Sequence, residues 1–375
     1  MTTSGMLRNK FTKSVSLDID KMWAKADRLI IKQLEGDGAL YCTIRFHCIF
    51  RKGILLLALP KERHLALATL SLYQPQARKA RCLVACVRLL IRYSLHTLFL
   101  PSRCFSFGGN GPIAELRAND AGFGFLLGNP ASKVRRVILA RKTGSEIVID
   151  KIGLSLSARR SVSSEVEIMC SLPDELPGLL KIRQSGANDH WSFYACPLVD
   201  GKSPEKRHDD LVVSIIRRWF DFAQKKALID TEQWSAICEF MEGIELEKGN
   251  RLLGEGKDVE VMMGIHHGDF TPWNVKITSE GKIVVIDWEY GSCSAPAAWD
   301  WIHYLLQRAS LVDQLSAADT LEVCRDWANT AQGKDFMAQA GWGGNVELCI
   351  GSYLVYSNAL GRFGHEGLLA EWMQE

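Results

Sequence analysis

The segment GIHHGDFTPWNVKITSEGKIVVIDWEYG, residues 264–291, holds the residues whose types and spacing could do chemistry. Asn274 follows Asp269 by five residues, and Asp287 follows Asn274 by thirteen, directly after the apolar run KIVVI. Phosphoryl transfer to a hydroxyl needs a carboxylate that orients the hydroxyl and accepts its proton, together with oxygen ligands for the Mg²⁺ that bridges the phosphates. Asp269 fits the first role, and Asn274 and Asp287 fit the second.

The segment has two other possible interpretations. A His-Gly-Asp triplet alone is more often a surface turn than a site. The matching asparagine and the aspartate at the end of a short strand reverse that preference. A metal hydrolase could also use an aspartate and histidine cluster, but the sequence has no second histidine pair at ligand spacing. His266 is assigned no role, and the pattern favours a kinase-type site.

The same residues resemble the aminoglycoside phosphotransferase and choline kinase family, which are small-molecule kinases with a protein-kinase-like fold. The resemblance lies in the motifs His267-Gly268-Asp269, Asn274 and Ile286-Asp287-Trp288. Their spacing also agrees with the catalytic loop and the metal-binding aspartate of protein kinases.

By this resemblance, Asp269 is the catalytic base, Asn274 and Asp287 bind magnesium, and His267 braces the loop. Further along, Asp300 in the segment SAPAAWDWIHYLL resembles the family's aspartate that steadies the catalytic loop through backbone hydrogen bonds. Asp269, His267 and Asp300 are therefore the expected catalytic set.

The resemblance also implies a lysine on the third strand of an N-lobe, which holds the nucleotide phosphates, and a glutamate on the next helix that pairs with it. Lys151 in EIVIDKIG is the lysine expected there, although by position alone it could equally be a solvent-facing strand residue. Glu165 is preferred to Glu167, because apolar residues follow Glu165 at the spacing of a core-facing helix stripe.

The remaining nucleotide contacts are expected in two loops. The turn Gly-Asn-Pro-Ala-Ser at residues 128–132 offers backbone N–H groups and the hydroxyl of Ser132, without a glycine-rich kinase motif or a Walker A sequence. The hinge that binds adenine through its main chain is expected near Cys196 and Leu198. Main-chain recognition does not distinguish ATP from GTP, so the expected cofactors are ATP or GTP with Mg²⁺.

The elements that position these residues are predicted from apolar patterns and turn residues. After a glycine-rich break come three strands, a helix halted by Pro173 and two more strands, and the chain is mostly helical from about residue 204. This order predicts an α+β, two-lobed protein-kinase-like fold. The small antiparallel-sheet N-lobe is expected at residues 116–201, and the helical C-lobe with the catalytic loop and acceptor site at residues 202–375.

The charge distribution sets the first part of the chain apart. With 47% hydrophobic and 23% charged residues the chain is ordinary globular protein, which excludes intrinsic disorder and collagen-like structure. The formal net charge is +2, yet residues 1–110 carry +12 and the rest −10. Residues 1–115 are therefore predicted to be a basic N-terminal extension of unknown fold.

Residues 63–100 contain six arginines and lysines and no acidic residue. Arg81, Arg88 and Arg92 share one helix face, so residues 78–100 could contact an anionic membrane peripherally. The alternative, a helix that packs on the protein with its arginines in solvent, is the commoner arrangement. Nucleic acid is not expected as a partner, since no binding motif accompanies the charge.

The location is expected to be cytoplasmic, with any membrane contact at the inner face. The eleven cysteines include no Cys-x-x-Cys pair and are too few for a disulfide scaffold in a chain of this length. The N-terminus has no apolar signal segment, and no apolar run is long enough to span a bilayer.

The expected activity is ATP- and Mg²⁺-dependent phosphoryl transfer to a hydroxyl of an aminoglycoside, a choline-like amine or a sugar or glycan. Residues 300–375 carry a net charge of −6, which suits a cationic acceptor. Alternatively, the acidic residues only keep the surfaces of the helices solvated. The four tryptophans there suit cation–π contact or sugar stacking, or else fill the core: Trp301, Trp327, Trp342 and Trp372. The alternative function is a catalytically silent nucleotide-binding module, recruited to a partner or membrane by the basic region.

Overall fold

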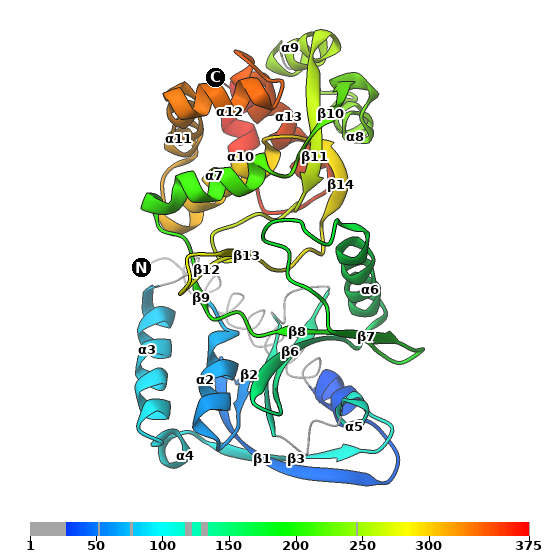
Figure 1. Cartoon of the computed structure of the whole chain (residues 1–375), viewed down its shortest axis with the longest axis vertical. Coiled ribbons are helices and arrows are strands. Elements are labelled where there is room, and N and C mark those ends of the chain that lie inside the picture. Colours follow the sequence, from blue (N-terminus) through cyan, green and yellow to red (C-terminus); the bar gives the residue numbers. More distant parts are fainter. Residues whose placement is uncertain are drawn as a thin grey trace, which may run out of the picture. The chain divides into compact units, whose positions relative to one another are not determined.

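A computed structural model describes residues 28–51, 53–75, 78–116, 122–128, 134–244 and 247–374. The chain divides into two compact units (Figure 1). Unit 1 comprises the described residues up to 166 together with residues 181–198, and unit 2 comprises residues 167–180 and the described residues from 199 onward. The chain therefore passes between the units at three places, the last of them between Leu198 and Val199.

Unit 1 is built on an eight-stranded antiparallel sheet with the strand order β3-β1-β2-β4-β5-β6-β8-β7. The three strands predicted after the glycine-rich break are confirmed as β4, β5 and β6. A two-residue turn joins β5 to β6, and Gly144 adopts there the positive φ of 61° that such tight hairpins require. The strands are β1 (Leu40–Arg51), β2 (Ile54–Leu59), β3 (Ser102–Gly108), β4 (Phe123–Leu127), β5 (Arg136–Thr143), β6 (Glu146–Gly153), β7 (Gln184–Ala187) and β8 (Ser192–Pro197).

The basic region is part of this sheet, whereas the sequence suggested a separate extension ending near residue 115. Strand β1 pairs with β2 and β3, and β2 pairs with β4 through Leu57 and Leu126. Phenylalanines from both sides of the expected boundary, among them Phe46 and Phe123, share one core cluster. The charge asymmetry misplaced the boundary because charge marks exposed faces, while apolar residues set the pairing of strands.

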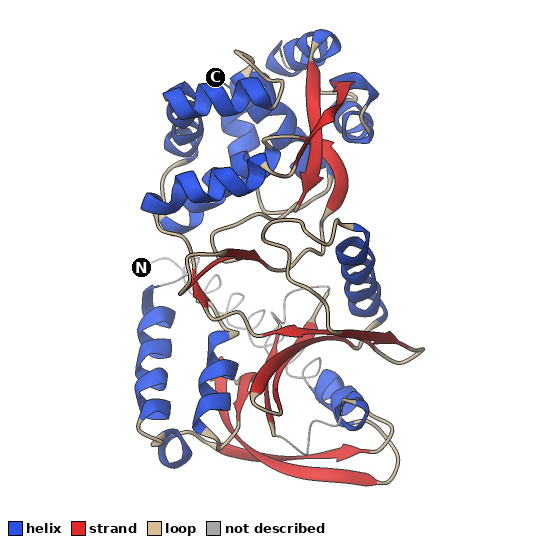
Figure 2. Ribbon diagram, viewed as in Figure 1, coloured by secondary structure: helices blue, strands red, loops and turns tan. Residues whose placement is uncertain are grey.

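Helices cover the sheet of unit 1. Helix α2 packs on β2, β4 and β5, and α3 packs against α2 (Figure 2). Val87 and Ile91 are the buried residues of α3 in this contact. None of the helices in the described ranges has the length and apolar character needed to cross a bilayer. The helices are α2 (Arg63–Ser71), α3 (Arg78–Arg92), α4 (His96–Phe99), α5 (Pro112–Glu115) and α6 (Leu156–Ser171), and a further helix covers residues 28–35.

Unit 2 combines eight α-helices in its described residues with two three-stranded sheets, of order β10-β11-β14 and β13-β12-β9. Helix α10 is its centre, because all nine of its residues are buried. The strands are β9 (Gly201–Lys202), β10 (Phe220–Ala227), β11 (Glu260–His266), β12 (Val275–Thr278), β13 (Ile283–Val285) and β14 (Ser292–Pro296). The helices are α7 (Asp209–Arg217), α8 (Glu232–Met241), α9 (Glu247–Glu255), α10 (Trp299–Gln307), α11 (Ala317–Asn329), α12 (Ala331–Gln339), α13 (Val346–Ala359) and α14 (Glu366–Gln374). The predicted α+β fold class, with one antiparallel-sheet unit and one mostly helical unit, is confirmed.

Candidate active site

The loop His267-Gly268-Asp269 leaves the end of β11 and is held by the first turn of α10. Gly268 has a φ of 79°, and a Cβ there would lie 2.2 Å from the carbonyl oxygen of Tyr290, so only glycine fits. The carboxylate of Asp300 accepts the backbone N–H of His267 at 2.7 Å and that of Gly268 at 3.1 Å. Asp300 thus makes the backbone hydrogen bonds that the sequence resemblance implied.

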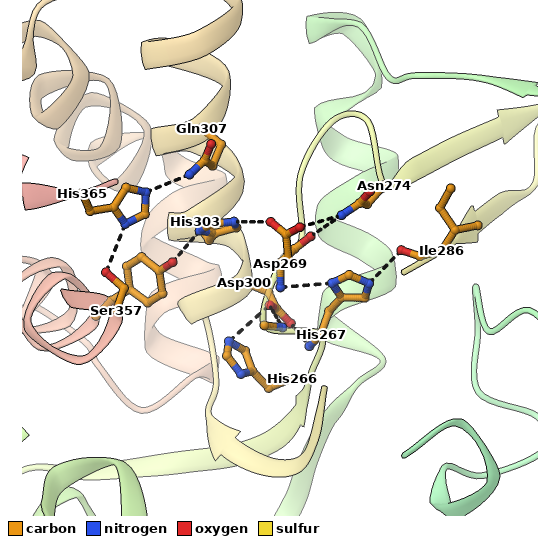
Figure 3. Close-up of polar contacts among 12 residues, drawn as sticks. His266, His267, Asp269, Asn274, Ile286, Asp300, His303, Gln307, Ser357 and His365 are labelled. Atoms are coloured by element: carbon orange, nitrogen blue, oxygen red, sulfur yellow. Dashed lines mark hydrogen bonds and ion pairs between the residues drawn. The ribbon is translucent and has the colours of Figure 1, made fainter. Parts of the chain in front are cut away.

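His267 braces the loop through both of its ring nitrogens (Figure 3). Its Nδ1 lies 3.2 Å from the backbone nitrogen of Asp269, which donates to it, and its Nε2 lies 3.0 Å from the carbonyl oxygen of Ile286. An acceptor at Nδ1 requires a neutral ring with the proton on Nε2. Burial lowers the pKa of His267, in keeping with a neutral ring. The ring therefore ties Asp269 to the residue that precedes Asp287.

The carboxylate of Asp269 is held from two sides. The side-chain nitrogen of Asn274 donates to Oδ2 and to the main-chain oxygen of Asp269, each at 2.9 Å. Nε2 of His303 lies 3.1 Å from Oδ1. Burial and the neighbouring charge of Asp287 raise the pKa of Asp269 to about 7. The Asp269 side chain keeps 18% of its surface exposed, so an alcohol could reach it.

The residues expected to bind magnesium lie beside this carboxylate. Both hydrogen bonds from Asn274 use its amide nitrogen, which leaves the amide oxygen as the atom for a cation. Asp287 is near enough for its charge to raise the pKa of Asp269, and a divalent cation would offset that repulsion. Within the described ranges no group of three or more His, Cys, Asp or Glu could hold a metal ion. Mg²⁺ commonly takes only one or two protein ligands and completes its shell with phosphates and water, so these two residues fit it.

In unit 1, Lys151 and Glu165 form the predicted ion pair. Nζ of Lys151 on β6 lies 2.6 Å from Oε2 of Glu165 on α6, and the hydroxyl of Tyr194 donates to Oε1 at 2.9 Å. The side chains of Lys151 and Glu165 are 8% and 0% exposed, so the solvent-facing interpretation of Lys151 is wrong. Glu167, the runner-up, is exposed.

Of the two loops expected to contact the nucleotide, the structure describes in full only the predicted hinge at Cys196 and Leu198. Ser132 lies outside the described residues. Cys196 is in β8, opposite Ile149, and burial raises the pKa of its thiol to about 12, so it is protonated at neutral pH. The N–H of Leu198 donates to the carbonyl of Ile147 at 3.0 Å, which leaves only the Leu198 carbonyl for a main-chain contact with adenine. The predicted hinge nevertheless coincides with the point where the chain passes from unit 1 to unit 2.

Sequence reasoning missed two residues of the site, His303 and Tyr353. The hydroxyl of Tyr353 is hydrogen-bonded to Nδ1 of His303. His303 could have been found, because it follows Asp300 by three residues on α10 and therefore lies on the same helix face. Tyr353 has no local signal, since it lies fifty residues farther along, on α13.

The tryptophans suggested for an acceptor are mostly core residues. Trp301, Trp342 and Trp372 are 0%, 1% and 2% exposed. The face of Trp372 is covered by the chain's own Lys248, whose Nζ lies 4.6 Å from the ring centroid. Only Trp327 is partly exposed, so the core-filling interpretation holds for the other three.

Comparisons with known proteins give structural similarities only. No protein-family model matches the chain. No curated protein matches it either. Among solved structures, the chain is similar to aminoglycoside phosphotransferase APH(4)-Ia at 9% identity, covering 70% of this chain and 95% of that one, with a TM-score of 0.46. It is also similar to choline kinase LicA from Streptococcus pneumoniae at 16% identity, with 63% and 86% of the chains covered and a TM-score of 0.36.

A third similarity is to spectinomycin phosphotransferase APH(9)-Ia, solved with ADP and spectinomycin. The identity is 12%, the coverage 67% of this chain and 87% of that one, and the TM-score 0.37. The solved structures to which the chain is similar thus include aminoglycoside phosphotransferases and a choline kinase. The fold class of the chain is α+β, as the sequence predicted, and its protein-kinase-like character stays a prediction.

Proposed function

We propose that this protein transfers the γ-phosphoryl group of ATP or GTP to a hydroxyl of a small molecule, with Mg²⁺ as cofactor. The observation that carries the proposal is the arrangement at Asp269. This partly exposed carboxylate is fixed by Asn274 and His303, and the charge of a second carboxylate, Asp287, is near enough to raise its pKa. Such a set provides a base for an alcohol and oxygen ligands for a cation.

The chain's own residues would divide the work as follows. Asp269 would accept the proton of the acceptor hydroxyl, and a pKa near 7 suits a base that works at neutral pH. Asn274 and Asp287 would hold Mg²⁺, which when bound neutralises charge on the phosphates. His267 and Asp300 would keep the loop in place, and Lys151, fixed by Glu165, would supply a positive charge for the phosphates.

Among the acceptors considered, a sugar or glycan is favoured over a choline-like amine. The partly buried ring of Phe363 lies 4.5 Å from the ring of His303, which contacts the base, and 5.7 Å from the ring of Tyr290. The guanidinium of Arg362 already lies over Tyr290, 4.2 Å from its centroid. A cationic acceptor would be repelled at that ring, whereas the apolar face of a sugar can stack on Phe363.

The central test is ADP release by the Asp269→Asn variant across amino sugars, choline analogues and glycans. We expect turnover to fall about 10²- to 10⁴-fold, because the base is lost, while Mg·ATP still raises the melting temperature. Asp287→Ala should abolish that rise. Asp326→Asn, at an exposed position on α11, is the control that should leave both unchanged.

Two outcomes would contradict the proposal. An Asp269→Asn protein with full turnover would remove Asp269 from the role of base. A wild-type protein that is stabilised by Mg·ATP but releases no ADP with any acceptor would favour the silent nucleotide-binding module instead.

We also propose a peripheral contact of α3 and α4 with an anionic membrane surface. Along these helices the exposed large apolar side chains are Leu83, Leu89, Tyr93, Leu95, Leu98 and Phe99. Arg81, Arg88 and Arg92 are exposed on α3, and no acidic residue occurs between Glu62 and Glu115. Exposed apolar side chains mixed with arginines match a headgroup region, where phosphates meet the cations and acyl chains meet the apolar groups.

Vesicle flotation tests this contact. The full chain should float with phosphatidylserine-containing vesicles and not with neutral phosphatidylcholine vesicles. Reversing the charge of Arg81, Arg88 and Arg92 to Glu should abolish flotation, and the same change at the exposed Lys202, Lys206 and Lys257 should not. Equal flotation of the two triple variants, or none by the wild type, would end the idea.

A further inference from the structure

A buried chain of three side chains ends on the catalytic carboxylate. The hydroxyl of Tyr353 is hydrogen-bonded to Nδ1 of His303. Nε2 of His303 lies 3.1 Å from Oδ1 of Asp269 (Figure 3). His303 and Tyr353 are only 1% and 2% exposed. The proposed phosphotransfer uses His303 only as a contact of Asp269 and gives Tyr353 no role.

We propose that His303 and Tyr353 are positioning residues that hold the carboxylate of Asp269 in the orientation needed to receive the acceptor's proton. The inference rests on the proposed role of Asp269 as the base. In the proposed arrangement, the Tyr353 hydroxyl donates to Nδ1 of His303, and the Nε2–H of His303 donates to Oδ1 of Asp269.

The direction of these hydrogen bonds follows from the ionised carboxylate. An ionised carboxylate can only accept, so the ring must carry its proton on Nε2. A neutral ring then has a lone pair on Nδ1, which the Tyr353 hydroxyl can satisfy only by donating. Burial lowers the pKa of His303 to about 3 and raises that of Tyr353, so the ring is neutral and the hydroxyl keeps its proton.

The arrangement fixes the plane of the carboxylate. Asn274 holds Oδ2 and His303 holds Oδ1, so rotation of the carboxylate would break one hydrogen bond or the other. Helix α10 serves twice, because Asp300 holds the backbone of the loop and His303, one turn along, holds the side chain of the base. Small misplacements of a catalytic group can cost about 10²-fold in rate, which gives such positioning a measurable effect.

A second buried histidine provides an internal control. Nδ1 of His365 is 3.0 Å from the hydroxyl of Ser357, and Nε2 is 2.9 Å from the side-chain nitrogen of Gln307. Ser357 and Tyr353 both lie on α13, four residues apart, and each hydroxyl contacts Nδ1 of a buried histidine. The side-chain hydrogen bonds of His365 go to Ser357 and Gln307 and not to Asp269, so its pairing should matter for stability and not for turnover.

The first experiment is NMR of the full chain with ¹⁵N-labelled histidine, above neutral pH and without nucleotide. We expect His303 to show a protonated Nε2 and an unprotonated, hydrogen-bonded Nδ1, with the signals assigned by their loss in His303→Gln. A ring protonated on Nδ1, or on both nitrogens, would overturn the proposal. This measurement does not depend on the protein being a kinase.

The second experiment compares kinetics of ADP release. Tyr353→Phe should lower kcat about 10-fold with the KM for ATP within about 2-fold, since the base is displaced but nucleotide binding is not. His303→Leu should lower kcat about 100-fold, and His303→Gln, whose amide can still donate to Asp269, should recover most of it. Ser357→Ala should leave both constants unchanged.

The two experiments separate the possible failures. If Tyr353→Phe and Ser357→Ala have equal effects on kcat, or if His303→Gln is no better than His303→Leu, the positioning role is wrong although the phosphotransfer stands. If the wild type releases no ADP, the proposed function fails, and the NMR tautomer then decides the pairing by itself.

Discussion

Lys151 and Glu165 form a buried ion pair 2.6 Å long. Both are withdrawn from water, and the hydroxyl of Tyr194 completes the hydrogen bonding of the carboxylate. Removing one member of a buried ion pair leaves the other charge uncompensated. The loss of folding free energy is then larger than the stabilisation that the intact pair provides. The pair is therefore sensitive to a change that conserves shape and removes charge.

We expect Glu165→Gln to lower the free energy of unfolding by about 3 kcal/mol, because the buried Lys151 loses the ion pair with Glu165. The rise in melting temperature with Mg·ATP should also shrink, since the ammonium is no longer held in place. Glu167→Gln changes an exposed residue of the same helix and should cost less than about 0.5 kcal/mol. Urea unfolding with and without Mg·ATP measures both, and similar losses for the two variants would argue against the pair.

At the residue scale the sequence predicted those contacts that lie within short, motif-like stretches. His267, Asp269 and Asn274 span eight residues, and Asp287 follows on the next hairpin, so their mutual positions are set locally. Glu165 was separable from Glu167 because the apolar stripe of α6 fixes which side is buried. The contact of Tyr353 with His303 could not be predicted from the sequence, because only tertiary packing brings α13 and α10 together.

At the scale of elements, side chains of α10 and α13 hold a pair of neutral histidines. His303 and His365 stand 5.6 Å apart between ring centroids, and burial lowers the pKa of each to about 3, from an ordinary 6.5. Two neighbouring imidazoles cannot both be charged there without repulsion. The packing of these helices therefore depends on both rings staying neutral.

The pairing predicts how stability changes with pH. A histidine with a lowered pKa binds its proton more readily in the unfolded chain, so its contribution is complete above pH 6.5 and is lost as pH falls toward 3. Each such histidine adds about 1.4 kcal/mol per pH unit to the slope within that window. His365→Gln should reduce the slope by about that amount, and His190→Gln, at an exposed position, should not. Equal slopes for wild type and His365→Gln would contradict the prediction.

For other helices and strands, the sequence did not predict which elements they pack or pair with. The helix at α3 was expected from its arginine stripe. The pairing of β1 and β2 with the rest of the sheet was not expected, because strand register is decided by partners distant in sequence. The exposed Leu83 and Leu89 of α3 likewise became visible only once Val87 and Ile91 were seen to be its buried residues.

At the scale of the whole molecule, the described part of unit 1 has one sheet rather than a separate basic extension and a kinase-like lobe. Strands β1, β2 and β3 supply one end of the sheet, and β2 covers the edge of β4. The core cluster joins Phe46, Phe105 and Phe107 from these strands to Phe123 and Phe125 of β4. The sequence could not show this, since a change in charge resembles a domain boundary whether or not the strands continue across it.

A chain beginning at residue 111 should therefore fail to form a cooperative unit 1. The deletion removes β1–β3 together with α2–α4, exposes the edge of β4, and uncovers Phe123 and Phe125, each 0% exposed in the intact protein. Burial of a phenylalanine is worth about 2 kcal/mol, and an open apolar edge invites aggregation. We expect no cooperative thermal transition for unit 1 by near-UV circular dichroism and strong binding of a hydrophobic dye. The triple Arg→Glu variant of α3, which alters exposed positions only, should keep the wild-type transition. A truncated chain that melts cooperatively at the wild-type temperature would show that residues 1–110 are, after all, an appendage.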